Sequence, residues 1–590
     1  MIKELSELGL KICEKKYGEW NNVALKEEFI SIEIVIDNNG NFCSFQHVDK
    51  MTPRAEALTS KKGKARLLLD KAEEVLCYGD KPVSKHQLFL EKLNLFRDIS
   101  VLNPVIAFYE ENKINGVGKA VQEFETQIPD EKNRKGNIAF RIQGMSNRIH
   151  EEPDILNRII IRYKETYKTE KTCSICCKAD YPVEDIPHGM IKKVPDGQPS
   201  GCALVSYNEK AFESYGLIGN DNSSICTNCA KAYVEGLNWL LSNGNECVDI
   251  NKKGKEKKTF RYTNRKNFGS DTAMVFWTRE NKKLKELDTL ERPTEDEVAI
   301  LIESVVSGAK KSLEPDYFYS CTLSGSASRI FIRDWIEISL FDFRKSIAKW
   351  FMDIAIGEYN SDQKKIKTHY ARLYNLAKSC QRINSDGSID DKDTSWSRAA
   401  VHLWNSALKN SPAPLWILTK VLQRARVDKN GLTADRASLI KLILNRHKGG
   451  GDFMIKEEIQ KENRSTAYVC GQIFAKMESI QYHALKERNA GIKEKFFTFA
   501  MTIPASAFGR LFNLNSKHFT KLKSDKPGLA VNLDKELQEL CIGINSFPAI
   551  FSLVEQGQFA IGYYHQRQAQ FSNIKNNEEA QKLSEPLGLF

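Results

Sequence analysis

Two pairs of cysteines carry the spacing in this chain that is most typical of metal chemistry. Cys173 and Cys176 form one C-x-x-C pair, and Cys226 and Cys229 form the other. The two-residue spacing lets both thiolates of a pair bind one ion, and two pairs complete the tetrahedral shell of Zn²⁺. Because four thiolates leave no open coordination position, the predicted zinc ion is structural rather than catalytic.

The segment between the two pairs, residues 177–225, is longer than in compact zinc modules, so we expect an insertion that loops out between them. This insertion offers alternative ligands, since Cys177 competes with Cys176 and both His188 and Cys202 lie within it. A second interpretation is that the cysteines are reduced and buried in unrelated turns. A redox role is disfavoured because neither pair lies in a thioredoxin-like βαβ setting.

A run of basic residues between 252 and 266 has the composition of a nucleic-acid contact. Lysine and arginine neutralise phosphates, and the interleaved Phe260 and Tyr262 are able to stack on an unpaired base. The alternative interpretation is a solvated loop without a ligand. The predicted contacts of this run are Lys252, Lys253, Lys255, Lys257, Lys258, Arg261 and Arg265.

Further candidate contacts lie nearer the N-terminus. Gly63 allows the backbone of a basic loop to approach a phosphate closely. Asparagine and glutamine side chains read base edges, and Asn115 precedes a glycine in a segment that we expect to enter a groove. The predicted contacts here are Lys61, Lys62, Lys64, Arg66, Asn115 and Gln143.

Short motifs of the common catalytic families are missing from the sequence. We find no G-x-x-x-x-G-K-[ST] phosphate loop, no H-E-x-x-H and no G-x-S-x-G. The ten histidines are scattered singly, and no set of carboxylates indicates a two-metal nuclease. We therefore expect that the protein is not an enzyme.

The composition is that of a folded protein with a moderate positive charge. Hydrophobic residues make up 41% of the 590 residues, which is enough for several cores. The net charge of +11 fits a protein that meets phosphate, although a mildly basic enzyme would carry the same charge. We see no signal peptide and no long apolar run, and therefore expect a reducing, cytoplasmic location without a membrane span.

Hydrophobic periodicity predicts an α+β fold, mixed in the N-terminal part and helical beyond Trp335. Alternating, β-branched segments predict strands at Phe29–Ile36, Ile138–Ile142, Ile159–Tyr163, Ala203–Tyr207, Ala273–Trp277 and Arg329–Ile332. Apolar residues at helical spacing predict helices at Lys85–Leu95, Glu295–Val306, Ile347–Ile356, Ala371–Leu376, Ala399–Leu408 and Leu415–Leu422.

Capping and breaking residues divide the helical part. Thr433 is expected to cap a helix, and the glycine run 449–451 to interrupt the helical pattern. The segment from Met454 to Phe590 is predicted to be a helical unit broken at Pro504, Pro527 and Pro548. We divide the chain into an α+β N-terminal domain (1–170), a zinc-containing insertion (171–232), the continuation of the α+β domain (233–345), a helical connecting region (346–453) and a C-terminal helical bundle (454–590).

Four blocks of sequence resemble the large-subunit family of type I-C CRISPR-associated proteins. The strongest, Glu555–Arg567 after Phe547-Pro548, resembles the C-terminal signature Q-G-x-F-x-x-G-Y-Y-H-Q. Ala203–Gly216 is similar to L-V-S-F-N-x-x-A-F-x-S-Y-G, and Leu323–Arg333 is similar to L-S-x-N-x-x-R-x-x-x-R. Ala467–Glu478 is similar to A-Y-x-x-G-R-x-F-A-x-x-E.

Some positions depart from these patterns. Ser326 stands where the family usually carries asparagine, and Gln472 stands where it carries arginine. The second cysteine pair falls where many relatives have none. In the last block we expect Phe559 and Tyr563 in the core, and a polar surface formed by His565, Gln566 and Arg567.

The resemblance implies the large subunit of a Cascade surveillance complex, in which guide RNA supplies sequence specificity and the protein reads the protospacer-adjacent motif (PAM). It also implies assistance in duplex opening and R-loop formation. The implied partners are the guide RNA (crRNA), target double-stranded DNA and its displaced non-target strand, the backbone and small subunits, and a separate helicase-nuclease. We assign PAM contact to the N-terminal candidates with Ser326 and Arg329, and DNA-backbone contact to the basic run from Lys252.

Two other functions remain open at this point. One is a nucleic-acid-processing nuclease with a structural zinc, and the other is a purely structural assembly subunit. The resemblance further implies that the last helical part can be made separately, as a small subunit, from an internal start. Met454 is well placed for such a start because it follows the glycine run.

Overall fold

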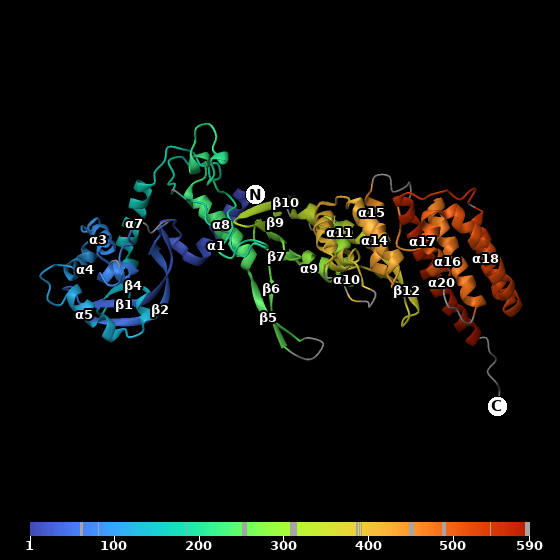
Figure 1. The fold of residues 1–590 in the computed structure, drawn as a ribbon, viewed down its shortest axis with the longest axis horizontal. Helices are drawn as coiled ribbons and strands as arrows, with labels where there is room; N and C mark the ends of the chain where they lie inside the picture. The colour runs from blue at the N-terminus through green and yellow to red at the C-terminus, as the bar shows by residue number, and fades with distance from the viewer. Residues whose placement is uncertain are drawn as a thin grey trace, which may run out of the picture. The chain divides into compact units, whose positions relative to one another are not determined.

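The computed structural model describes residues 1–58, 63–80, 82–184, 186–250, 256–306, 316–384, 388, 390, 392–447, 454–485, 491–542 and 544–583, with the side chains of residues 249, 250 and 573–583 left aside. Two compact units make up the chain (Figure 1). Unit 1 contains residues 1–266, 271–279 and 321–335, and unit 2 contains residues 267–270, 280–320 and 336–590. The five-part division drawn from the sequence stays a prediction.

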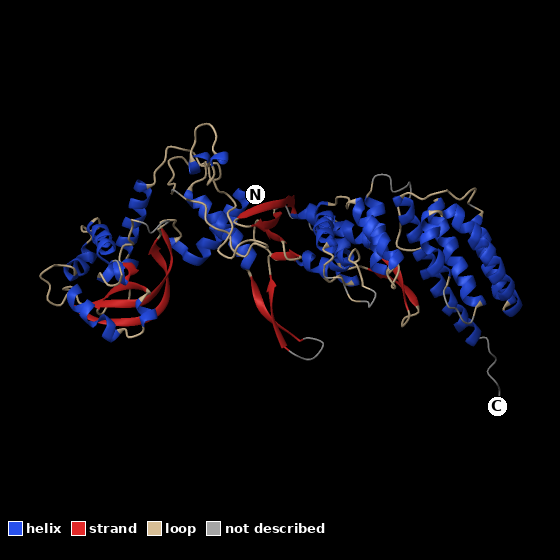
Figure 2. Cartoon of the chain, viewed as in Figure 1, coloured by secondary structure: helices blue, strands red, loops and turns tan. Residues whose placement is uncertain are grey.

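The strands of the described residues lie before residue 370, and Figure 2 draws them in red. They are β1 (Leu25–Ile36), β2 (Phe42–Glu56), β3 (Leu69–Lys71), β4 (Asn137–Ile142), β5 (Gly244–Ile250), β6 (Glu256–Tyr262), β7 (Arg265–Phe268), β8 (Thr272–Thr278), β9 (Tyr317–Ser326), β10 (Arg329–Ser339), β11 (Ile356–Asn360) and β12 (Lys365–His369).

Helices alternate with these strands and then form the remainder of the chain. They are α1 (Ile2–Tyr17), α2 (Ala72–Leu76), α3 (Pro82–Asn94), α4 (Asn103–Phe108), α5 (Val117–Gln127), α6 (Glu131–Arg134), α7 (Pro153–Thr166), α8 (Thr227–Ser242), α9 (Lys285–Glu291), α10 (Glu295–Val306), α11 (Leu340–Ile354), α12 (Leu373–Lys378), α13 (Ser395–Lys409), α14 (Leu415–Val427), α15 (Ala434–Arg446), α16 (Thr466–Ala484), α17 (Ile492–Thr502), α18 (Pro504–Asp525), α19 (Pro527–Cys541) and α20 (Leu553–Leu583).

The first sheet of unit 1 has the strand order β2-β1-β4-β3. Its central pair, β1 and β4, is parallel, whereas β2 and β3 join it in antiparallel fashion. Side chains alternate along a strand, so Ile32, Ile34 and Ile36 of β1 enter one core. The helices α3, α4, α5 and α7 supply the aromatic and aliphatic side chains that complete this core.

The remaining strands form a second sheet and two hairpins. The second sheet has the order β10-β9-β8-β7. The antiparallel pairs β5–β6 and β11–β12 are separate two-stranded ribbons. These sheets confirm the α+β class and place most of the strands in the N-terminal part, ahead of a helical C-terminal part.

Most predicted elements are confirmed, and their boundaries follow the predicted signals. The hydroxyl of Thr433 accepts a hydrogen bond from the backbone N–H of Arg436 and caps α15. Pro504 and Pro527 occupy the first turns of α18 and α19, where the missing N–H costs nothing. The glycine run 449–451 lies outside the described residues.

Two predictions of secondary structure are wrong. Ile159–Tyr163 belongs to α7, because its apolar residues continue the helical spacing of Ile155 and Leu156. Ala203 forms a single bridge to Arg329 instead of beginning a strand. Further along the chain, α11 ends at Ile354 and the β11–β12 hairpin follows. Among the described residues, no helix has the length and apolarity needed to cross a bilayer.

Candidate metal centre and nucleic-acid interface

The four predicted cysteine ligands meet in unit 1. The sulfur atoms of Cys173, Cys176, Cys226 and Cys229 all lie within 4.8 Å of one another, and the Cys176 and Cys226 sulfurs are 3.9 Å apart. Three of the four side chains are buried and Cys176 is partly buried. This is the arrangement that four thiolates around a single tetrahedral ion require.

Local backbone structure positions both pairs. In the first, a tight turn closes with a hydrogen bond of 2.9 Å from the Cys177 N–H to the Cys173 carbonyl. In the second, Cys226 is the N-cap of α8, and its sulfur accepts a hydrogen bond of 3.4 Å from the Cys229 N–H. The positive end of the helix dipole therefore lies at the sulfur cluster and favours thiolates.

The electrostatics of the cluster also fit a metal. The hydrogen bond from Cys229 lowers the pKa of the Cys226 thiol, which favours its thiolate form. Anionic sulfur is the form that binds zinc. The donor set and its burial therefore fit a structural zinc ion held by Cys173, Cys176, Cys226 and Cys229, with no position left for a substrate.

The alternative ligands lie outside this cluster. Cys177 is exposed, and the Cys202 thiol donates to the carbonyl of Ala327 at 3.3 Å. His188 contacts the hydroxyls of Tyr233 and Ser223 at 3.1 and 3.3 Å. Burial lowers the pKa of His188 to about 4, so its ring is neutral.

The insertion returns to the turn between β9 and β10, where another family-like block lies. The N–H of Ala203 donates to the carbonyl of Ser328 at 2.7 Å, and the N–H of Ile330 donates to the carbonyl of Ala203 at 3.1 Å. Gly325 lies so close to Gly197 that a Cβ on Gly325 would come within 2.6 Å of the Gly197 Cα. Only glycine permits this approach.

Arg329 joins the two blocks through its side chain. One of its terminal nitrogens donates to the Asn208 amide oxygen at 2.7 Å, and its guanidinium lies 4.6 Å from the centre of the Phe212 ring. Arg329 is partly exposed and Ser326 is exposed. A guanidinium has five N–H donors, and Arg329 uses one of them in this hydrogen bond. The other donors stay available to a base edge or a phosphate. The sequence predicted Ser326 and Arg329 but missed Asn208 and Phe212 as their neighbours.

The basic run forms the second arm of the β5–β6 hairpin, which Figure 1 draws as a green ribbon. Lys257, Lys258 and Arg261 are exposed. Successive side chains point to opposite faces, so Lys257 and Arg261 share one face while Lys258 and Phe260 share the other. The predicted residues Lys252, Lys253 and Lys255 lie outside the described residues.

Arg265, by contrast, anchors the base of this ribbon. Its side chain is buried, donates to the carbonyls of Lys193 and Leu241 at 2.9 and 3.2 Å, and stacks 4.7 Å from the centre of the Tyr262 ring. These contacts assign Arg265 to support of the hairpin. Its exposed neighbours Lys257 and Arg261 are better placed to meet a phosphate.

The N-terminal candidates lie near opposite ends of β1. Arg66 is buried and pairs with Glu28 at 2.8 Å, and the Lys64 ammonium donates to the Tyr167 hydroxyl at 3.1 Å. A nucleic acid would reach Arg66 only by displacing Glu28. The predicted residues Lys61 and Lys62 lie outside the described residues.

Asn115 and Gln143 are brought together near the end of β1. Both are exposed. The Asn115 carbonyl accepts from the N–H of Phe42 at 2.7 Å, and the Gln143 side chain accepts from the Cys43 thiol at 3.6 Å. At about 3.3 Å per residue, the end of β1 at Ile36 lies roughly 26 Å from Glu28. These two candidates therefore share a surface that Arg66 does not reach.

The two C-terminal family-like blocks pack against each other in unit 2. The hydroxyl of Tyr468 in α16 lies 2.9 Å from Nδ1 of His565 in α20. A Cβ on Gly471 would come within 2.1 Å of the Phe559 carbonyl oxygen, and one on Gly562 within 2.0 Å of the Tyr468 carbonyl oxygen. The glycines of both blocks therefore set a close helix crossing.

This packing corrects one expectation about the C-terminal signature. Phe559 and Tyr563 are buried, as predicted. His565 and Gln566 are also buried, although a polar surface was expected for them. Burial lowers the pKa of His565 to about 3, so its ring is neutral and bonded to Tyr468.

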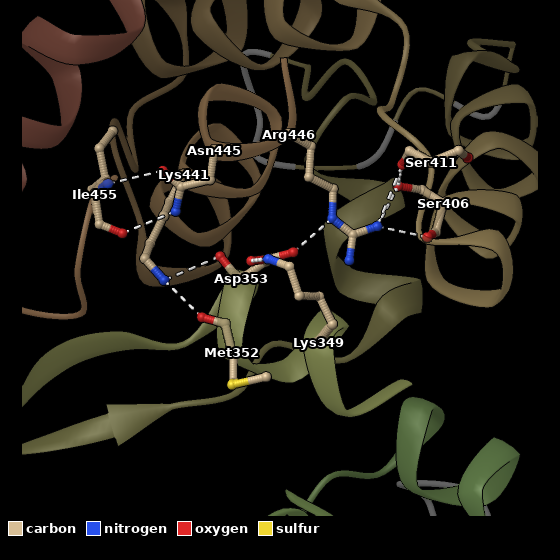
Figure 3. Close-up of polar contacts among 9 residues, drawn as sticks. All are labelled: Lys349, Met352, Asp353, Ser406, Ser411, Lys441, Asn445, Arg446 and Ile455. Atoms are coloured by element: carbon tan, nitrogen blue, oxygen red, sulfur yellow. Dashed lines mark hydrogen bonds and ion pairs between the residues drawn. The ribbon is translucent and has the colours of Figure 1, made fainter. Parts of the chain in front are cut away.

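An ionic cluster in unit 2 joins α11 to α15 (Figure 3). The carboxylate of Asp353 accepts from Lys349 at 2.6 Å and from Arg446 at 2.7 Å. Lys441 donates to the backbone carbonyls of Met352 and Asp353 at 3.0 and 3.1 Å. The last turn of α11 is thereby fixed to α15. No sequence motif marked these residues.

Comparison with known proteins places the chain in a family. Residues 11–571 match the family described as CRISPR-associated protein (Cas_Csd1). None of the curated proteins matches the chain. Because the matched region covers nearly the whole chain, the protein belongs to the Csd1 family of CRISPR-associated proteins.

Proposed function

We propose that this member of the Csd1 family is the large subunit of a type I-C Cascade surveillance complex, and that it recognises the PAM on target duplex DNA. Guide RNA supplies the sequence specificity by pairing, while the protein reads the short flank and the DNA backbone. The proposal assigns the chain no catalytic step. It places the complex in the cytoplasm, where the large subunit assists R-loop formation and recruits a separate helicase-nuclease.

The observation that carries this proposal is the meeting of two family-like blocks at Arg329. The guanidinium is held in place by Asn208 and Phe212 while remaining partly exposed. Such a pre-oriented fork suits a bidentate contact with guanine in a major groove, or with a phosphate. The exposed hydroxyl of Ser326 lies in the same turn region and offers a second polar contact.

The zinc centre supports this surface in the proposal. The cysteine pairs close the base of the insertion, and the insertion in turn delivers Asn208 and Phe212 to Arg329. Zinc would therefore fix the geometry of the reading surface without contacting DNA. The β5–β6 ribbon, with Lys257 and Arg261 exposed, would hold the phosphate backbone of the target duplex.

The test is a binding assay on the chain assembled with guide RNA and its partner subunits. Target duplexes share one protospacer and differ only in the flanking trinucleotide. We expect tight binding that depends on the flank and is lost without the large subunit. Arg329→Ala should lower the discrimination between flanks by about 1–3 kcal/mol. The control Arg97→Ala, at another exposed arginine of unit 1, should leave it unchanged.

Equal binding to every flank would reject PAM reading by this protein. Metal-dependent cleavage of DNA by the purified chain would favour the rival function, a nuclease with a structural zinc. Flank-dependent binding that survives omission of the large subunit would favour a purely structural assembly role.

A further inference from the structure

A pocket in unit 1 combines carboxylates with apolar walls, and none of the predicted contacts lines it. Its volume is about 580 Å³, which is in the range of small-molecule sites. The walls come from α1, the start of β1, the end of β2, the insertion around Glu184, and α8. One face of α8, with Asn228, Lys231 and Glu235 at helical spacing, lines the pocket.

Glu184 brings a buried carboxylate to this pocket. Its side chain is 2% exposed. One oxygen accepts from the Lys231 ammonium at 2.9 Å and from the Tyr163 hydroxyl at 2.8 Å. The other oxygen, Oε2, is buried and has no hydrogen-bond partner in the part of the chain that the structure describes. Because a buried oxygen without a donor costs free energy, a ligand that donates a hydrogen bond to it is favoured.

Glu235 supplies a second carboxylate on the same wall. It lies four residues after Lys231 on α8, a rise of about 6 Å along the helix. Its side chain is exposed and makes no hydrogen bond or ion pair within the described residues. The protein around it still removes part of its hydration, which raises the pKa of its carboxyl. A positively charged donor in the pocket would compensate this carboxylate.

The cations of the pocket leave little for an anionic ligand. Lys231 is held by Glu184 and by the carbonyl of Val23 at 2.7 Å. Lys26 pairs with Glu28 at 2.8 Å. Lys192 remains, and its side chain is exposed to water. An anion would have to displace existing ion pairs, whereas a cation meets carboxylate oxygens that are already free.

The other walls suit a hydrocarbon chain. They include the apolar side chains of Leu10, Val23, Leu25 and Pro53, and the ring of Trp20. Methylene groups gain free energy by burial against such residues, and an indole ring attracts ammonium groups to its face. A ligand with ammonium groups joined by short methylene chains therefore matches both the charged and the apolar parts of the lining.

We propose that this pocket binds a linear aliphatic polyamine, with Glu184 Oε2 and the Glu235 carboxylate accepting hydrogen bonds from two of its ammonium groups. The inference is independent of the proposed function, since it uses none of the residues assigned to DNA. It also links the ligand to the cysteine cluster, because α8 carries Cys226 and Cys229 as well as Lys231 and Glu235.

The test measures binding of spermidine to the purified full-length chain, free of nucleic acid, by titration calorimetry at physiological ionic strength. Glu235→Gln keeps the shape of the side chain but removes its charge, and should weaken spermidine binding by at least about tenfold. The matched control is Glu14→Gln, which removes an exposed carboxylate of α1 that does not line the pocket. The control should bind spermidine like the wild type.

A second ligand tests the need for two ammonium groups. 1-Aminobutane has one ammonium group and should bind the wild type at least about tenfold more weakly than spermidine. Absence of spermidine binding by the wild type, or equal affinities of the wild type and Glu235→Gln, overturns the proposal. An equal loss in Glu14→Gln also overturns it, because spermidine would then respond to general surface charge. The duplex assay with varied flanks contains no polyamine, so its outcome and this one are separate.

Discussion

At the scale of single residues, the chemistry of this protein depends on which side chains are held in place and which stay free. Arg329 and Arg265 were both predicted to contact DNA, Arg329 at the PAM and Arg265 at the backbone, yet their surroundings differ. The buried Arg265 side chain donates to two backbone carbonyls, whereas the Arg329 side chain donates one hydrogen bond and stays partly exposed. Burial and local partners therefore distinguish an arginine that supports the fold from one that stays partly exposed.

The cysteine cluster gives the first prediction at this scale. Cys173→Ser should lower the zinc content of the purified chain from about one to about zero ions, because three thiolates hold the ion poorly. It should also lower the melting temperature, since metal binding contributes to folding. Zinc is measured by mass spectrometry of the metal and unfolding by calorimetry.

The adjacent exposed cysteine provides the control for this experiment. Cys177→Ser should retain both the zinc and the melting temperature, because its sulfur lies outside the cluster. A metal-free wild-type chain, or retention of zinc by Cys173→Ser, would contradict the assignment.

Lys441 gives a prediction for the dependence of stability on pH. Burial lowers its pKa to about 8 from a usual value of 10.5. Between these values the unfolded chain binds more protons than the folded chain, so the free energy of unfolding rises with pH. This residue should contribute a rise of about 2 kcal/mol between pH 7.5 and 10.

The measurement compares urea unfolding of the wild type and Lys441→Met across that range. The difference in unfolding free energy between the two should grow with pH in favour of the wild type. Ionisation of buried tyrosines and cysteines affects both proteins alike and cancels in the difference. A difference that stays constant with pH would show that Lys441 titrates normally.

At the scale of elements, close crossings and exposed ribbons decide what each segment does. The α16–α20 crossing brings backbone to backbone at two glycines, and Figure 1 shows these helices side by side in the red and orange part of the chain. The β5–β6 ribbon, by contrast, pairs with no further strand among the described residues. Isolated two-stranded ribbons are only marginally stable in water, which fits an element that gains a partner on binding.

Gly471→Ala should destabilise unit 2 by at least about 2 kcal/mol, because the new methyl group would force α16 and α20 apart. The matched control is Gly509→Ala in the interior of α18, where a Cβ meets nothing within 4 Å. That substitution should stabilise the chain by about 0.5–1 kcal/mol. Chemical unfolding measures both, and equal effects would contradict the close crossing.

Charge reversal on the ribbon should change duplex binding. Lys257→Glu/Arg261→Glu should reduce the slope of log K against log salt by about 1.8, at about 0.9 per lost phosphate contact on duplex DNA. Lys164→Glu/Lys168→Glu, two exposed lysines elsewhere in unit 1, should leave the slope unchanged. Equal slopes for the wild type and the ribbon variant would exclude this ribbon as a DNA-backbone contact.

At the scale of the whole molecule, the chain consists of two compact units, and the family resemblance relates the last helical part of unit 2, residues 454–590, to a separately made small subunit. Met454 begins the segment that leads into α16 and is exposed. In the full chain this segment is tied back to α15, because Asn445 and Ile455 exchange two hydrogen bonds of 2.9 Å. A product starting at Met454 would lack that attachment.

The prediction at this scale concerns such a product. In cells expressing a C-terminally tagged chain, Met454→Leu should abolish a short product while the full-length chain persists, since leucine does not support the same initiation. Met501→Leu in α17 is the control and should leave the short product intact. Immunoblotting measures both, and a short product that survives Met454→Leu would refute the internal start.

Much of the architecture followed from the sequence because its signals are local. Hydrophobic alternation predicted β1 and β4, a hydroxyl at Thr433 predicted a cap, and C-x-x-C spacing predicted the metal ligands. Each signal depends on residues within a few positions of one another. The errors at Ile159–Tyr163 and Ala203–Tyr207 arose where short apolar runs fit a strand and another structure equally well.

The tertiary structure alone decided which distant residues meet, because contacts between remote segments leave no fixed spacing in a sequence. It joined Arg329 to Asn208 and Phe212, fixed α11 to α15 through Asp353, and brought Glu184 and Glu235 to one pocket. It also buried Arg66 and His565, whose residue types suggested exposure. The sequence thus determined the elements and the cysteine cluster, whereas packing between elements determined which charged side chains stay exposed.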